Sequence, residues 1–268
     1  MVPRPSGPPR SVLISGASSG IGAALAQRYA APDTHLFLCG RDADRLGAVA
    51  AACRAAGARV EATVLDVAVR PETERWVRDA EAAAPLDLVI ANAGVSAGTS
   101  GAPGTRGFYG ESTEQTRRIL AVNVEGVLNT VAPALPAMQA RARGHIALMS
   151  SLAAFRGLPG AAAYSASKAA VKTYGEALRL TLAPSGIAVT VICPGFVDSR
   201  ITERNRFPMP LKMSAERAAD LIARRLERAP ARIAFPLPLY AAVWLLGALP
   251  PAVGDRLLKH SKHTTYGD

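Results

Sequence analysis

Residues 11–22 read SVLISGASSGIG, and they give the strongest indication of the fold. The run SVLIS is apolar and stops at a glycine, and the helical pattern GAALAQRYA follows directly. Glycines between a strand and a helix let the backbone turn tightly and approach a pyrophosphate, which the helix N-terminus attracts. The stretch predicts the opening of a nucleotide-binding unit, and its candidate cofactor-binding residues are Gly16, Ser18, Ser19, Gly20, Ile21 and Gly22.

The alternation of strand and helix patterns continues to about residue 195. Five further apolar runs read as buried strands: THLFLCG, RVEATVLDV, LDLVIANAG, GHIALMSS and IAVTVICPG. Apolar strands separated by helices indicate a parallel sheet that is covered on both faces. The sequence therefore predicts an α/β fold, a single-domain, doubly wound parallel sheet of the Rossmann type with helices on both faces. Its long helical stretches are expected at about 112–140 and 161–184.

Three segments are expected along the chain. Residues 1–10 are Pro-rich, lack the apolar core of a signal peptide and are expected to form a disordered lead. Residues 11–232 form the Rossmann-type domain, including a short substrate lid at 200–213. Residues 233–268 form an apolar extension with a basic tail.

The composition limits the functions that the chain can have. Its net charge is +10, and residues 200–268 hold twelve basic against six acidic residues. The chain has few aromatics and lacks a recognisable nucleic-acid motif, so DNA or RNA binding is not expected. Three scattered cysteines do not suggest disulfides, no spacing suggests a metal site, and a reducing cytoplasm is expected.

Polar and small residues follow the predicted strands, where ligands bind in such sheets. At the end of the second strand, an acidic residue would bind the 2′-hydroxyl of NAD, but Gly40 stands there and Arg41 follows. This pair favours the 2′-phosphate of NADP. The third and fourth strands end in further candidate cofactor-binding residues, Asp66, Val67, Asn92, Ala93 and Gly94.

The segment AAYSASKAAV, residues 162–171, contains a tyrosine and a lysine four residues apart. On a helix, Tyr164 and Lys168 share one face. They are either an exposed tyrosine beside a solvated lysine, or a tyrosine whose pKa a neighbouring cation lowers for proton exchange. Ser151 precedes Tyr164 by thirteen residues. Asn123, inside a helical apolar pattern, either has buried partners or holds a water beside the lysine.

Together, the motifs SGASSGIG, NAG, VN, SS, YSASK and PG resemble the short-chain dehydrogenase/reductase family, in its single-domain branch. The resemblance covers about residues 10–200. It implies that Tyr164 is the general acid or base and that Lys168 lowers its pKa and holds the nicotinamide ribose. It also implies that Ser151 polarises the substrate carbonyl and that Asn123 anchors a water leading to Lys168.

The same resemblance implies that four residues border the nicotinamide: Pro194, Gly195, Val197 and Ser199. Ser199 stands where the family usually has threonine, and Ser15 likewise replaces the threonine of the glycine turn. The Gly-rich segment 95–113 is longer than the family pattern, and we expect a mobile loop there near the substrate.

These residues predict an NADP(H)-dependent oxidoreductase, with NAD(H) as the alternative cofactor. It would interconvert a carbonyl and a secondary alcohol by hydride transfer, act on a hydrophobic substrate and form a homo-oligomer. A non-catalytic NADP(H)-binding sensor and a membrane-surface scaffold are the alternatives.

The C-terminal third leaves several interpretations open. In the lid, Phe207, Met209, Leu211 and Met213 suit an adaptable apolar pocket, while Arg200, Arg204 and Arg206 either meet an anionic substrate group or are solvated. About a dozen residues lie between Pro238 and Pro250, too few to span a bilayer. The segment 233–262 would cover the substrate pocket, pack in a subunit interface or rest on a membrane surface, which would make a cytoplasmic protein peripheral to the membrane.

Overall fold

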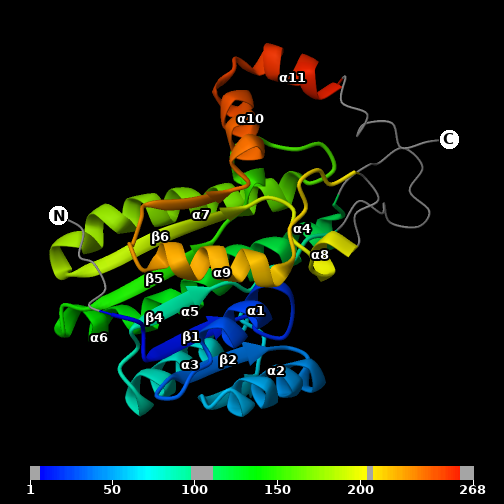
Figure 1. Ribbon diagram of the computed structural model, residues 1–268. Coiled ribbons are helices and arrows are strands. Elements are labelled where there is room, and N and C mark those ends of the chain that lie inside the picture. The colour runs from blue at the N-terminus through cyan, green and yellow to red at the C-terminus, as the bar shows by residue number, and fades with distance from the viewer. Residues whose placement is uncertain (1–6, 98–110, 204–207, 260–268) are drawn as a thin grey trace.

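A parallel sheet of seven strands forms the centre of the molecule, in the order β3-β2-β1-β4-β5-β6-β7 (Figure 1). This computed structural model describes residues 7–97, 111–203 and 208–259. Each pair of neighbouring strands is parallel, which confirms the predicted α/β sheet. The strands are β1 (Ser11–Ser15), β2 (His35–Gly40), β3 (Arg59–Val64), β4 (Leu88–Ala91), β5 (Gly144–Met149), β6 (Ile187–Pro194) and β7 (Arg232–Phe235).

Helices cover both faces of the sheet, and each face has its own apolar core. Side chains of α1 (Gly20–Tyr29), α2 (Ala43–Ala55) and α9 (Ala215–Leu226) bury one face. The opposite face packs against α3 (Arg70–Ala83), α5 (Gly126–Val131) and α7 (Ala162–Leu182). Because both faces are buried, the central strands are apolar throughout, as the sequence suggests.

The helical stretch expected at 112–140 is interrupted. It consists of α4 (Thr113–Leu120), a π-helical turn η1 (Ala121–Glu125), α5, a 3₁₀ turn η2 (Ala132–Ala134) and α6 (Leu135–Ala140). By length and composition this run could cross a membrane, but half of its most apolar window is buried inside the fold. Its apolar character is therefore explained by packing on the sheet.

The seventh strand was not expected from the sequence. β7 pairs with β6 from Arg232 to Phe235, so the segment predicted to start an extension at Ile233 begins inside the sheet. The strand has only four residues and runs into a continuous apolar, Pro-containing stretch, so no change of period marks its end. The sheet domain includes β7, and the extension starts after it.

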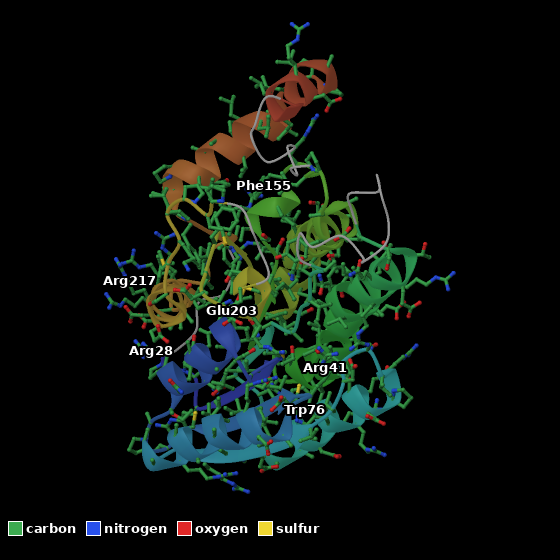
Figure 2. All side chains as sticks on the ribbon, turned by 90° about the vertical axis from the view of Figure 1, so that its right-hand side faces the viewer. Arg28, Arg41, Trp76, Phe155, Glu203 and Arg217 are labelled. Atoms are coloured by element: carbon green, nitrogen blue, oxygen red, sulfur yellow. The ribbon has the colours of Figure 1, made fainter. Side chains whose placement is uncertain are left out.

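The extension consists of α10 (Leu237–Ala248) and α11 (Pro251–Lys259), which project from the body of the molecule (Figure 1). The apolar stretch before Pro250 thus forms a helix of 12 residues, α10. Its base rests on Phe155, whose ring lies 5.4 Å from that of Tyr240 (Figure 2). None of the residues of α10 is buried.

The predicted lid contributes α8 (Arg200–Glu203) and a bridge between Val197 and Met213. The predictions for several residues concern positions outside those that the structure describes: Arg204, Arg206, Phe207, Lys262, residues 1–6 and most of the loop 95–113. All three cysteines, Cys39, Cys53 and Cys193, are free thiols buried in the core.

Candidate active site

The glycine-rich turn after β1 is built so tightly that side chains would not fit. Gly16 and Gly20 have φ of 69° and 54°, in the left-handed region that favours glycine. A Cβ at Gly22 would lie 2.2 Å from the carbonyl oxygen of Gly16. The turn therefore brings backbone, rather than side chains, to the start of α1, where a phosphate group would be attracted.

Ser15 joins this turn to the end of β4. Its hydroxyl accepts hydrogen bonds from the backbone N–H groups of Asn92 (3.1 Å) and Ala93 (3.2 Å). In the other direction, the Asn92 side chain donates hydrogen bonds to the carbonyl oxygens of Ser15 (3.0 Å) and Gly16 (3.2 Å). The replacement of threonine by serine thus keeps the hydroxyl that holds the two strand ends together.

The ends of β2 and β3 carry charged groups at the outer part of the site. A Cβ at Gly40 would lie 2.9 Å from the Ser18 side chain, so glycine is required there. The side chain of Arg41 is 57% exposed and lies 4.0 Å from the carboxylate of Asp66. Arg45 forms an ion pair with Asp42 (2.7 Å) beside it.

Asp66 is held ionised at the edge of the site. Burial by itself would raise the pKa of this carboxyl, but hydrogen bonds from the Ala68 N–H (3.0 Å) and from Arg118 outweigh it and lower the pKa. Arg41 lowers it further through its charge. No sequence pattern points to Arg118, which contacts Asp66 from α4, 52 residues away.

The two serines after β5 have different surroundings. Ser150 is buried, and its hydroxyl donates to the carbonyl oxygen of Lys168 (2.7 Å), which ties the strand to α7. Ser151 is half-buried and forms a hydrogen bond with the Tyr164 side chain. Of the two, Ser151 is therefore the one that shares a surface with Tyr164.

Lys168 lies buried beneath Tyr164. Its Nζ donates to the carbonyl oxygen of Met149 (2.9 Å) and lies 5.8 Å from the centre of the Tyr164 ring. Burial lowers the pKa of Lys168 to about 8. Lys168 is buried and Tyr164 is half-buried, so the interpretation as an exposed tyrosine beside a solvated lysine is wrong.

The structure corrects one expectation about Tyr164. Burial raises its pKa above the ordinary value, and the hydrogen bond with Ser151 offsets only part of that increase. The expected net lowering by Lys168 is therefore wrong for the protein as it stands. The spacing of two residues cannot report desolvation, which here exceeds the effect of the neighbouring groups.

Asn123 lies fully buried in the π-helical turn between α4 and α5. Its Oδ1 accepts from the Val95 N–H (2.8 Å), while its Nδ2 donates to the Val95 carbonyl (3.0 Å) and to the Ser167 hydroxyl (3.0 Å). A Cβ at Gly94 would lie 3.4 Å from Asn123 Oδ1 and 3.2 Å from Lys168 Nζ, so glycine keeps these two polar atoms near each other.

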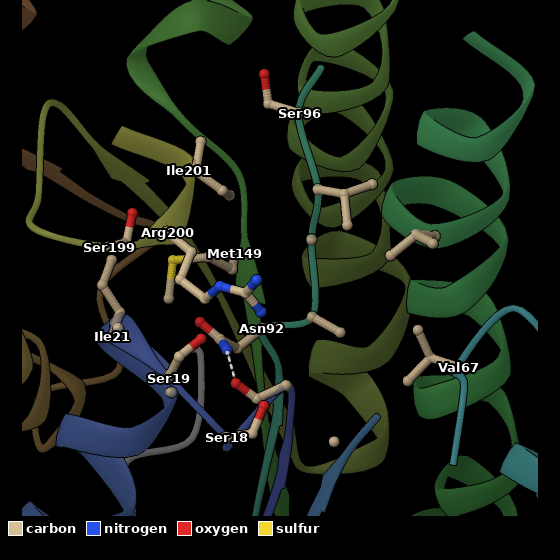
Figure 3. A pocket seen from close by; sticks show the side chains of 18 of the residues that line it. Ser18, Ser19, Ile21, Val67, Asn92, Ser96, Met149, Ser199, Arg200 and Ile201 are labelled. Atoms are coloured by element: carbon tan, nitrogen blue, oxygen red, sulfur yellow. Dashed lines mark hydrogen bonds between the residues drawn. The ribbon is translucent and has the colours of Figure 1, made fainter. Parts of the chain in front are cut away.

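A cleft of about 490 Å³ at the carboxyl ends of the strands brings the predicted residues together. Its lining includes every predicted cofactor-binding residue together with Ser151, Tyr164 and Lys168, but not Asn123, which lies behind it. Arg200 also lines this cleft, and its side chain is directed into it from α8 (Figure 3). The candidate residues, scattered from 16 to 199 in sequence, therefore form one site.

Sequence reasoning missed two residues that hold Tyr164 in this site. The carboxylate of Glu111 accepts from the backbone N–H groups of Ala163 and Tyr164 (3.0 Å to the latter). Ser167 donates to the Tyr164 carbonyl (2.7 Å). The capping-box pattern STEQ directly after Glu111 marks a helix start, but not a contact 53 residues away.

Comparison with known proteins agrees with this geometry. The family model described as short chain dehydrogenase matches residues 10–208. An "uncharacterized oxidoreductase" of Myxococcus xanthus is 42% identical over 248 residues, which are 92% of this chain and 95% of that protein.

Solved structures resemble the molecule over most of its length. A short-chain dehydrogenase from Sphingobium yanoikuyae in complex with NADPH is 28% identical, with a TM-score of 0.76, covering 96% of this chain and 98% of that one. A 3-ketoacyl-ACP reductase from Sinorhizobium meliloti 1021 is 26% identical, with a TM-score of 0.74, covering 87% and 99%.

Proposed function

The chain belongs to the short chain dehydrogenase family, and we propose that it is an NADP(H)-dependent oxidoreductase that interconverts a carbonyl and a secondary alcohol. The observation that carries the proposal is the meeting of Ser151, Tyr164 and Lys168 at one end of a cleft whose other end is the glycine-rich turn. One end suits a dinucleotide phosphate, and the other offers a proton donor to a substrate oxygen.

A nicotinamide cofactor bound in this cleft would supply the hydride that the carbonyl carbon receives. Tyr164 donates its phenolic proton to the carbonyl oxygen, and in the oxidation direction its phenolate takes that proton back. Ser151 donates a hydrogen bond to the same oxygen and polarises the carbonyl. Burial raises the pKa of Tyr164 further above its ordinary value, so the phenol carries its proton at neutral pH, which suits the role of general acid.

Lys168 would act on this step through charge and position. Its ammonium group lies under the Tyr164 ring and is already held by the Met149 carbonyl. We assign it to the ribose hydroxyls of the cofactor and to stabilising the phenolate that forms when the proton leaves. Asn123 helps to hold the segment around Tyr164 and Lys168 in place, because its amide is hydrogen-bonded to Val95 and Ser167.

The preference for NADP(H) over NAD(H) rests on Gly40 and Arg41. A carboxylate at position 40 would repel a 2′-phosphate, whereas the exposed guanidinium of Arg41 can pair with it. The Sphingobium yanoikuyae relative was solved with NADPH, which supports this choice.

A hydrophobic substrate fits the walls near Tyr164. Val95, Met149 and Ile201 are among the apolar residues that line the cleft. Behind Gly195, Leu239 of α10 packs so closely that a Cβ on that glycine would lie 3.1 Å from it. We therefore propose that the first turn of α10 helps to enclose an apolar substrate. This corresponds to the first of the three expected roles of the extension, covering the substrate pocket.

The partners that we propose are a small carbonyl or alcohol, a second copy of the chain and an anionic membrane surface. We propose that subunits join through the helical stretches at 112–140 and 161–184, which expose Leu120 (40%), Leu128 (39%) and Leu180 (76%). On α10, Trp244 and Leu245 are more than half exposed, and basic residues follow in the sequence. The apolar surface of α10 and the basic residues after it favour a peripheral membrane contact. The three buried free thiols favour a reducing cytoplasm.

The decisive experiment follows NADPH absorbance with a panel of small, long-chain and polycyclic carbonyls. Tyr164→Phe removes the hydroxyl and keeps the ring, so turnover should fall by at least ~10²-fold while NADPH binding persists. Retained turnover in this variant would refute the role of Tyr164. NADPH binding without turnover on any carbonyl would favour the sensor, and vesicle binding without either would favour the scaffold.

A further inference from the structure

The helix that carries Tyr164 and Lys168 begins without a side chain of its own to cap it. Ala161 occupies the N-cap position of α7, and no side-chain hydrogen bond closes the first turn from there. The first N–H groups of a helix have no partner within the helix, and an unsatisfied first turn frays. Tyr164 is in this first turn, so its position depends on how those N–H groups are satisfied.

Glu111, which lies outside the helix, accepts hydrogen bonds from two of the N–H groups in the first turn of α7. One carboxylate oxygen accepts from the Tyr164 N–H at 3.0 Å, and the other accepts from the Ala163 N–H. The Glu111 side chain is buried, with 8% of the residue exposed. A negative charge at a helix N-terminus is favourable, so a carboxylate suits this place better than a neutral group.

The position of Glu111 is itself fixed by its neighbours. The next residue, Ser112, begins α4 with a capping box, in which Ser112 accepts from Gln115 N (3.1 Å) and Gln115 accepts from Ser112 N (2.8 Å). The carboxylate therefore extends from a capped helix start, and it joins the start of α4 to the start of α7.

The backbone of Tyr164 is also held on its carbonyl side. Its carbonyl accepts from the Ser167 hydroxyl (2.7 Å), which in turn accepts from Asn123 (3.0 Å). Glu111, Ser167 and Asn123 thus restrain the backbone of Tyr164 from both sides. Small displacements of a reacting group reduce turnover steeply, because a proton is transferred only at hydrogen-bond distance.

We infer that Glu111 is a positioning residue for Tyr164, which acts through the backbone of α7 and not by contact with the substrate. The inference rests on the proposed role of Tyr164. It makes the carboxylate a requirement for full turnover, and it also predicts an electrostatic effect. A negative charge beside the residue that becomes a phenolate opposes the loss of the phenolic proton.

The test compares Glu111→Gln with Glu114→Gln, an exposed glutamate in the first turn of α4. Glutamine keeps one acceptor, but it presents an N–H₂ group to the second N–H and removes the charge. For Glu111→Gln we expect kcat to fall about tenfold, KM for NADPH to stay within twofold, and the alkaline limb of the pH profile to move to lower pH. Glu114→Gln should match the wild type in all three.

A readout without substrate separates this inference from the proposed function. The tyrosinate absorbance of each protein is titrated with and without Tyr164→Phe, and the difference gives the pKa of Tyr164. This pKa should fall in Glu111→Gln even if no carbonyl is turned over by the wild type. An unchanged pKa, or a lower Tm with unchanged kcat and pH profile, would overturn the inference and leave Glu111 a purely structural cap.

Ser167→Ala provides a second variant if Glu111→Gln does not fold. It removes the hydroxyl that holds the backbone carbonyl of Tyr164, so kcat should fall by about the same factor with KM for NADPH unchanged. In the double variant the two losses should be less than multiplicative, because both act on the backbone of one residue. Wild-type kcat in Ser167→Ala, or strictly multiplicative losses, would contradict the inference.

Discussion

At the scale of single residues, the most consequential group is the ammonium of Lys168. Its pKa is lowered from 10.5 to about 8 because it is buried, so below pH 8 the folded protein holds a charge that the surroundings disfavour. Between pH 8 and 10.5 the unfolded chain binds this proton and the folded chain does not, so stability rises with pH there. The cost of the buried charge is thus fully present at neutral pH.

Lys168→Met should therefore stabilise the protein at pH 7 while removing its activity. Methionine keeps the apolar stem but loses the hydrogen bond to Met149, so we expect a net gain of about 1 kcal/mol, or ~2–4 °C in Tm. Melting curves at pH 7 and pH 9.5 measure the effect, and the gain should shrink at the higher pH. Lys172→Met, which removes an ion pair with Glu176 (3.1 Å), should instead be neutral or destabilising. A lower Tm for Lys168→Met at pH 7 would disprove this account.

Arg41 is the residue that we expect to select NADPH over NADH. A charge-assisted hydrogen bond to a phosphate contributes ~1.5–3 kcal/mol, so NADPH should be favoured over NADH by roughly ten- to a hundredfold in kcat/KM. Arg41→Ala should remove most of that ratio. Arg59→Ala, at an exposed arginine on β3 outside the cleft, should leave the ratio unchanged. A wild-type preference for NADH would show that Gly40 and Arg41 do not select the phosphate.

Among the secondary-structure elements, α10 and α11 are the ones that we expect to bind a membrane surface. Trp244 (54% exposed) and Leu245 (57%) form an apolar surface on α10, and Arg256, Lys259 and Lys262 follow in the sequence. Vesicles with anionic phospholipid should bind the protein in sedimentation assays more strongly than neutral vesicles. Replacing both residues with serine should weaken this binding at least tenfold, because burial of one such side chain contributes ~1.5–3 kcal/mol.

The control for α10 is Val64→Ser, which removes an equally exposed side chain (56%) from β3. Its vesicle binding should equal that of the wild type. If the α10 variant instead changes the mass of the particle in solution and not its vesicle binding, this surface is a subunit interface. A truncation that tests the extension must keep residues 232–235, because they form a strand of the sheet.

At the scale of the whole molecule, we expect light scattering to give at least twice the chain mass of 27.9 kDa. Leu128 and Leu180 expose apolar surface on α5 and α7, and burying it between copies would stabilise the assembly. Changing both to aspartate should shift the mass toward that of a monomer without lowering Tm by more than a few degrees, since neither side chain is buried in the fold. A fully active wild-type monomer at all concentrations would contradict the proposed assembly.

The sheet and the cleft could be predicted because their signals are local. Gly16, Gly20 and Gly22 stand together in sequence, and parallel strands bring residues such as Asp66 and Asn92 to one edge. Contacts between distant segments could not be predicted, as Glu111 and Arg118 show. β7 was missed because its four residues continue into an apolar stretch, and the raised pKa of Tyr164 was missed because it depends on burial.

Because the three cysteines are buried, a cysteine introduced at the surface could be labelled selectively. Burial raises the pKa of Cys39 to about 12 and that of Cys193 to about 11, and it raises the pKa of Cys53 as well. Thiol reagents attack the thiolate, so these native positions should react slowly while the protein is folded. A single cysteine introduced at exposed Leu245 would carry a fluorophore alone, and the motion of α10 could be followed without replacing any natural cysteine.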